Sequence, residues 1–200
     1  MIGFSLVLVA FVAAGEPVYR PPRPAAPRAA PGATGPDSTL SDEEVRQRAE
    51  AYLDALDVPV TPDQWRALGP RAVPFLEEVV TNPDGLPSRR AAAVGGLAVI
   101  GGNRAREVVL KTAHSDAEPV AVRAAALHGA PRVLTSRELV RELKPVLERA
   151  SEPATRAAAA DVLARHVPRA ACSAIRAQAG REAEGEAHFQ RALQRCGAVP

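Results

Sequence analysis

A motif that recurs at a fixed spacing constrains the fold of this chain more than any other feature. An arginine followed by three alanines occurs at Arg90, Arg123 and Arg156, so the interval is 33 residues from 90 to 123 and again from 123 to 156. Apolar residues recur four and seven positions after each arginine: Val94, Leu127, Ala160, then Leu97, Ala130, Leu163. Positions i, i+4 and i+7 share one helix face, so the motif predicts three equivalent amphipathic helices.

A second set of helical segments alternates with these three. The apolar faces expected for residues 104–113 and 136–149 are Ala105, Val108, Val109, Thr112 and then Leu139, Val140, Leu143, Val146, Leu147. Thr135 and Glu138 form a capping box at the start of the second segment. Pro145 inside that segment is expected to kink the helix or break it in two. Each 33-residue unit is therefore helix, turn, helix.

Further helices are expected on both sides of the repeats. Ser41 and Glu44 form a capping box for a helix over 42–56, and a helix opening at Thr61 carries Trp65 as a core residue. Residues 70–79 are its partner helix. Residues 168–180 and 181–196 form the C-terminal end, and Gly95-Gly96 and Gly101-Gly102 are expected to allow close packing and a helix stop.

The hydrophobic content comes from alanine rather than from large side chains. Hydrophobic residues make up 46% of the 200 residues, but aromatic residues only 4%. Alanine is the best helix former, whereas strands favour β-branched and aromatic residues. The composition therefore predicts an all-α protein and disfavours a sheet-based enzyme core.

The charge balance argues against a nucleic-acid surface. The net charge is +2, far from the excess that gives a phosphate-binding field. One alternative stays open, which is nucleic-acid backbone binding by an arginine-lined edge: Arg104, Arg106, Arg132, Arg137, Arg141.

The N-terminal part predicts export. Residues 1–15 hold an apolar run too short to span a membrane, which fits a signal peptide although no Lys or Arg precedes the run. An uncleaved apolar tail and a misplaced start codon are the alternatives. Residues 16–39 are a Pro/Ala/Arg-rich linker, in which a PxxP recognition peptide is a lesser alternative. We therefore expect a periplasmic or extracellular protein with no stable membrane span in the mature chain.

The chain has two cysteines, Cys172 and Cys196. In an exported protein Cys172 and Cys196 are expected to form a disulfide that ties the last helix back to the last repeat. Buried free thiols, a zinc site with His166 and His188, and a Cys172–His166 nucleophile and base are alternatives; the zinc spacing matches no usual pattern. No catalytic or phosphate-binding motif is present, so we expect no catalytic, metal or cofactor-binding residues and no cofactor.

The repeated segments resemble a known family. Residues 68–76 (LGPRAVPFL), 88–94 (SRRAAAV) and 121–127 (AVRAAAL) are similar to short, alanine-rich bacterial HEAT repeats, also found in phycobilisome-lyase-like proteins. The resemblance is clearest over 61–167 and implies a right-handed α-solenoid of about four helical pairs with atypical terminal helices over 40–200. It also implies that Asp84, Glu118 and Glu152 pair with the three repeat arginines in a stacked structural ladder. An arginine row that binds an acidic partner is the alternative.

HEAT units serve as protein-binding scaffolds, so the expected function is a non-catalytic interaction or scaffolding module that binds a protein or peptide. No nucleic acid is expected as a partner. A lyase-type or isomerase-type subunit is the alternative, and it requires an acidic or cysteine-bearing cluster on the binding face.

Overall fold

The computed structural model describes residues 40–55, 59–182 and 185–197. Within these ranges the chain is all-helical, with ten α-helices, two short 3₁₀ turns and no strand, which confirms the all-α prediction. The expected signal peptide over 1–15 and the linker over 16–39 lie outside the described residues. No helix in the described ranges combines the length and the apolar character needed to cross a membrane.

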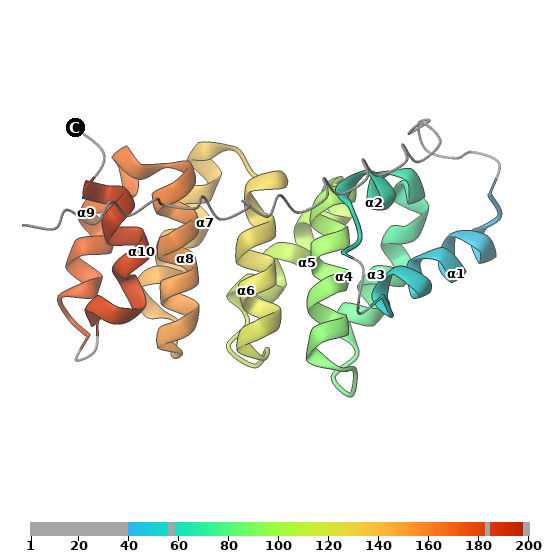
Figure 1. Ribbon diagram of the computed structural model, residues 1–200, viewed down its shortest axis with the longest axis horizontal. Helices are drawn as coiled ribbons and strands as arrows, with labels where there is room; N and C mark the ends of the chain where they lie inside the picture. Colours follow the sequence, from blue (N-terminus) through green and yellow to red (C-terminus); the bar gives the residue numbers. More distant parts are fainter. Residues whose placement is uncertain (1–39, 56–58, 183–184, 198–200) are drawn as a thin grey trace, which may run out of the picture. The chain divides into compact units, whose positions relative to one another are not determined.

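The helices follow one another with short connections (Figure 1). In chain order they are α1 (Asp42–Leu53), α2 (Pro62–Leu68), α3 (Val73–Thr81), α4 (Pro87–Ile100), α5 (Asn103–His114), α6 (Val120–Gly129), α7 (Ser136–Arg149), α8 (Pro153–His166), α9 (Pro168–Ala179) and α10 (Gly185–Gly197).

Local side-chain chemistry sets several of these boundaries. The expected capping boxes are present at α1 and α7, and a third box, Thr61 with Gln64, opens α2. In each box the hydroxyl accepts from an amide of the first turn and the side chain three residues later accepts from the cap amide. Gly101 and Gly102 have φ of 76° and 88°, a region that glycine adopts without strain, so α4 ends there as expected.

Two expected boundaries were wrong in detail. The helix expected over 42–56 ends at Leu53, and residues 56–58 are not described. The helix expected over 70–79 is divided into a 3₁₀ turn over Pro70–Ala72 and α3, because Pro74 has no amide to donate to the carbonyl of Pro70.

Pro145 was expected to kink its helix or break it in two, and the break does not occur. Helix α7 runs without interruption from Ser136 to Arg149. The carbonyl that loses its hydrogen bond belongs to Arg141, an exposed residue, so water can replace the missing amide. Meanwhile Leu139, Leu143 and Leu147 on the opposite face are buried and hold both halves of α7 on the core.

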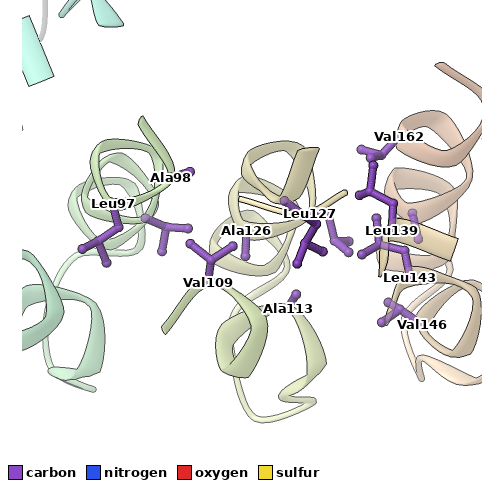
Figure 2. Close-up of a cluster of buried hydrophobic side chains, with 14 of the residues drawn as sticks. Leu97, Ala98, Val109, Ala113, Ala126, Leu127, Leu139, Leu143, Val146 and Val162 are labelled. Atoms are coloured by element: carbon purple, nitrogen blue, oxygen red, sulfur yellow. The ribbon is translucent and has the colours of Figure 1, made fainter. Parts of the chain in front are cut away.

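The helices pack in two rows. Helices α4, α6, α8 and α10 form the even row, in which each helix contacts the next, and α3, α5, α7 and α9 form the odd row in the same way. Each odd helix also packs against the even helix that follows it, and Figure 1 shows α4, α6 and α8 side by side. The core between the rows is built mainly from leucine, valine and alanine, including Leu97, Val109 and Leu127 (Figure 2).

Small residues let the helices of the even row approach closely. A Cβ atom added to Gly129 of α6 would lie 2.7 Å from the Cβ of Ala98 in α4. The third alanine of each repeat motif, at positions 93, 126 and 159, is fully buried. Gly96 likewise lets the Trp65 ring lie close against α4. Trp65 is buried as expected and packs edge-on against Tyr52.

The two adjacent glycines of α4 give a matched test of this packing. Gly96→Ala places a Cβ 2.9 Å from the Trp65 ring and should lower the free energy of unfolding by about 1–3 kcal/mol. Gly95→Ala meets nothing within 4 Å and should raise it by about 0.5–1 kcal/mol, because alanine is the better helix former. Urea unfolding followed by circular dichroism measures both, and equal effects of the two substitutions would refute the close approach.

Candidate functional site

The three repeat arginines occupy equivalent places near the start of α4, α6 and α8. Arg90 and Arg123 are buried, with 5% and 2% of the side chain exposed, and Arg156 is mostly buried, with 15% exposed. The Arg90 Nε donates to the carbonyl of Val80 at 2.8 Å, and its Nη2 lies 2.5 Å from a carboxylate oxygen of Glu118. Arg90 therefore ties α4 both to the preceding helix α3 and to the turn that follows α5.

Arg156 makes a similar set of contacts at α8. Its Nη1 donates to the carbonyls of Ala150 and Ser151 at 2.5 and 2.9 Å, and its Nε lies 2.6 Å from Glu182. The hydrogen bond with Glu182 raises the pKa of Arg156, which stays charged. Like Arg90, this arginine joins the preceding odd helix to the turn before the next even helix.

Arg123 differs from the other two in its partner. Its Nη1 lies 2.5 Å from Asp116, in the turn that precedes α6, and its buried Nε finds no acceptor among the described residues. The hydrogen bond and the charge of Arg123 lower the pKa of Asp116, so the carboxylate stays ionised at neutral pH.

The acids that pair with these arginines are not the expected ones. Asp84 is exposed in a tight turn, where its amide binds the side chain of Asn82, and Glu118 reaches Arg90 rather than Arg123. Glu152 raises the pKa of Arg156 only through its charge, whereas Glu182 is the hydrogen-bonded acid. The Nε contact with Val80 holds the Arg90 side chain in an orientation that carries its Nη2 to the following turn. Burial of these groups favours the structural interpretation of the row over an exposed acid-binding row.

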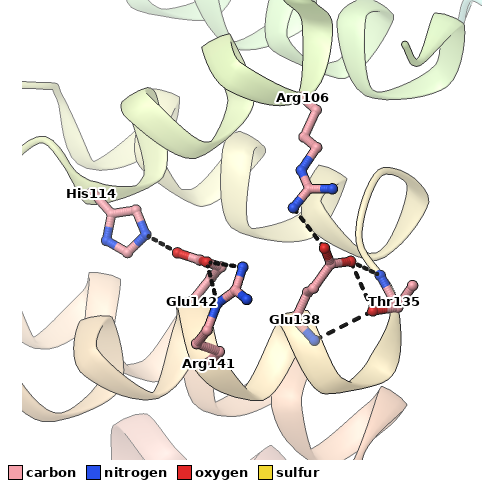
Figure 3. A network of polar contacts seen from close by, with 6 residues as sticks. All are labelled: Arg106, His114, Thr135, Glu138, Arg141 and Glu142. Carbon is pink, nitrogen blue, oxygen red and sulfur yellow. Dashed lines mark hydrogen bonds and ion pairs between the residues drawn. The ribbon is translucent and has the colours of Figure 1, made fainter. Parts of the chain in front are cut away.

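Most arginines of the expected arginine-lined edge form ion pairs with acids of the same surface. Arg104 is ion-paired with Glu77, Arg106 with Glu138 and Arg141 with Glu142. Figure 3 shows the last two pairs: Arg106–Glu138 joins α5 to α7, whereas Arg141–Glu142 lies within α7, and His114 of α5 also contacts Glu142 at 3.4 Å. Arg132 and Arg137 are exposed. Three of the five arginines are thus neutralised by acids of the same surface, which reduces the positive charge that this edge offers to a phosphate backbone.

Glu138 is the most perturbed acid of this network. Hydrogen bonds from the amide and hydroxyl of Thr135 and from Arg106 lower its pKa from 4.5 to about 2. The carboxylate thus completes the α7 capping box and joins α7 to α5 (Figure 3).

This lowered pKa predicts a pH-dependent contribution to stability. The stabilisation from ionised Glu138 is complete above its unfolded pKa near 4.5 and is lost as the pH falls toward about 2. Glu138→Gln keeps a side chain that can cap, as Gln64 does at α2, but removes the charge. The urea midpoint of the wild type should therefore exceed that of Glu138→Gln at pH 6, and the gap should close between pH 4.5 and 2.

The control for this comparison is Glu107→Gln, because Glu107 is exposed on α5 and makes no ion pair within the described ranges. Its midpoint should follow that of the wild type at every pH. A gap for Glu138→Gln that stays constant down to pH 2 contradicts the assigned role.

The cysteines join the last two helices. The sulfur atoms of Cys172 in α9 and Cys196 in α10 lie at the bonding distance of a disulfide, with Cα atoms 5.5 Å apart. The Nη2 of Arg176 also donates to the carbonyl of Cys196 at 3.0 Å. A sulfur in this bond is neither a nucleophile nor a zinc ligand, so the alternatives that used Cys172 with His166 are disfavoured. His188 lies outside the described side chains, and the described residues hold no cluster of three metal-binding side chains.

Removal of this crosslink should destabilise the fold. The double variant Cys172→Ser, Cys196→Ser opens a loop with a sequence separation of 24 and should lose about 3 kcal/mol of unfolding free energy. Urea unfolding of the variant and of reduced wild type should agree with each other and differ from the oxidised protein. Identical curves for all three, or two titratable thiols in unreduced protein, would exclude a stabilising disulfide.

A hollow of about 280 Å³ lies on the even row, where α6, α8 and α10 meet. Its floor is made of alanines from α8 and α10, and its polar lining is His128, Asp161 and Arg191. In the 33-residue register Gly95, His128 and Asp161 are equivalent positions, five residues after each repeat arginine. The repeat was visible in the sequence, but the hollow was missed because α10 lies outside the repeat pattern.

Arginines outnumber acids among the described residues around this hollow. The Asp161 carboxylate pairs with Arg165 at 3.0 Å and also with Arg195 of α10. No acid among the described residues pairs with Arg191. Burial, and then the charges of Arg165 and Arg191, lower the pKa of His128, while Asp161 acts in the opposite direction. His128 is therefore neutral at neutral pH.

Comparison of the chain with known family models, with curated proteins and with solved structures finds no match.

Proposed function

We propose that the described helices form a right-handed α-solenoid of the HEAT-like kind. Its four helical pairs are α3/α4, α5/α6, α7/α8 and α9/α10, with α1 and α2 as atypical terminal helices. The support is the combination of the 33-residue sequence period with two rows in which each helix packs on its neighbour. Such nearest-neighbour packing is the physical basis of repeat proteins.

The function that we infer for this helical stack is non-catalytic: it is a protein-interaction or scaffolding module. The observation that carries the proposal is the outward side of the even row, which we call the even face. On it the first two alanines of each repeat motif, at positions 91–92, 124–125 and 157–158, are partly or fully exposed. Beside them stands a residue that changes from repeat to repeat, from Gly95 to His128 to Asp161.

This pattern is suited to binding an extended chain. Alanine side chains let the backbone of a partner approach a helix closely, and the changing residue beside them supplies specificity. The open space above Gly95, with nothing within 4 Å of an added Cβ, shows that this part of the face is accessible.

Export to the periplasm or the extracellular space belongs to the same proposal. A disulfide between Cys172 and Cys196 is typical of oxidising compartments, so the cysteine geometry supports export. Cleavage of residues 1–15 as a signal peptide remains a prediction from the sequence.

An unbiased peptide library tests the interaction function. Peptides selected on the full-length protein should bind the even face, so Ala92→Arg on α4 or Ala154→Arg on α8 should weaken the binding of selected peptides at least tenfold. Fluorescence polarisation measures the affinities, and hydrogen exchange should show protection in α4, α6, α8 or α10.

The matched control is Ala177→Arg, which changes an equally exposed alanine on α9 of the odd row. It should leave binding within twofold of the wild type. Repeated selections that return no binding peptide, or binding lost equally in the control, would overturn the proposal.

A further inference from the structure

The hollow at α6, α8 and α10 combines an apolar floor with an excess of arginine. The floor consists of Ala154, Ala157 and Ala158 of α8 with Ala192 of α10. Arg191 belongs to the lining, and Arg165 and Arg195 flank the Asp161 carboxylate at its edge. Two guanidinium groups thus pair with one carboxylate and a third lines the same hollow, so the described charged side chains sum to about +2 with His128 neutral.

Among the described side chains, no further acid of the neighbouring helices pairs with these arginines. Asp161 is already engaged by two arginines, and its own side chain is only 14% exposed. Arg165 has 54% of its side chain exposed, and Arg191 is exposed without an acid partner in the described ranges. These two guanidinium groups have donors available for an added carboxylate, and a guanidinium binds a carboxylate through two parallel hydrogen bonds.

The size of the hollow indicates an anchor rather than a whole small molecule. About 280 Å³ is slightly below the range of roughly 300–1,000 Å³ that holds a drug-sized ligand. One or two side chains of an extended peptide match that space, while the alanines of α8 let the peptide backbone lie close to the helix. None of the described residues that line the hollow is Phe, Tyr or Trp, so the large aromatic rings typical of base-stacking surfaces are not among them.

We propose that this hollow is the acidic-peptide subsite of the even face, in which Arg191 and Arg165 bind an aspartate or glutamate side chain of an extended partner segment. This inference rests on the proposed interaction function and adds the chemistry of the partner. Helix α10 contributes Arg191 and Ala192, so the C-terminal helix that the disulfide ties to α9 is part of the binding site.

The test uses two fluorescent peptides that differ in charge alone. One is an eight-residue peptide of alanine and serine with two central glutamates, and the other has glutamines in their place. The full-length oxidised protein should bind the glutamate peptide at least tenfold more tightly at 50 mM salt, and the preference should shrink at 300 mM salt. Equal binding of the two peptides, or binding of neither, would overturn the subsite.

Charge reversal locates the subsite on the protein. Arg191→Glu and Arg165→Glu should each lower the affinity for the glutamate peptide at least tenfold, and Arg191→Gln should lower it by a smaller factor. The matched control is Arg169→Glu, which makes the same charge change on an exposed arginine of α9 and should alter binding less than twofold. Circular dichroism of each variant checks that the helices are retained, and an effect of Arg169→Glu equal to that of Arg191→Glu would refute the location.

Competition separates a peptide site from a general anion site. A single-stranded oligonucleotide with the same number of charges should displace the glutamate peptide only at a concentration at least tenfold higher than the unlabelled peptide. Equal competition means that the surface responds to charge alone, which overturns the peptide subsite.

The library selection separates failure of this inference from failure of the interaction function. If library-selected peptides bind the even face but their affinity is unchanged by Arg191→Glu, this inference fails while the interaction function stands. If no peptide is selected, the interaction function itself fails.

Discussion

Buried guanidinium groups at the ends of the even helices are the contacts on which the order of the stack depends. Arg90 and Arg156 each bind a carbonyl at the end of the preceding odd helix and an acid in the turn that follows the next odd helix. A buried charge is strongly destabilising unless it is paired and hydrogen-bonded, so each arginine favours the placement of its neighbours that supplies these acceptors. The 33-residue recurrence of this residue therefore sets the recurrence of the whole helical pair.

Alanine and glycine determine how close the even helices come. Each repeat motif buries its third alanine completely and leaves the first two at the surface. The alanines of one motif thus serve two roles: the third packs in the core, and the first two lie on the accessible surface. A helix with larger residues at these positions would hold its neighbours further apart and cover the even face with its own side chains.

The C-terminal end combines structural and proposed functional roles. The Cys172–Cys196 pair holds α10 on α9, and α10 in turn packs on α8, where it brings Arg195 to Asp161 and Arg191 to the lining of the hollow. Terminal helices of a stack have a neighbour on one side only, so they fray more easily than central ones. A crosslink at this end thus stabilises the helix that completes the hollow.

The sequence by itself determined the features that depend on near neighbours along the chain: the helix content, the capping boxes at Ser41 and Thr135, the glycine stop after α4 and the apolar faces of the repeats. It did not determine which acid meets each arginine, because a long side chain reaches several turns and only packing selects among them; Arg90 thus pairs with Glu118 and not with Asp84. Nor did it determine that α7 continues through Pro145, which depends on burial of the opposite face. The hollow also needed the tertiary structure, since its charges come from α6, α8 and α10, and no local pattern relates those helices across the loops that separate them.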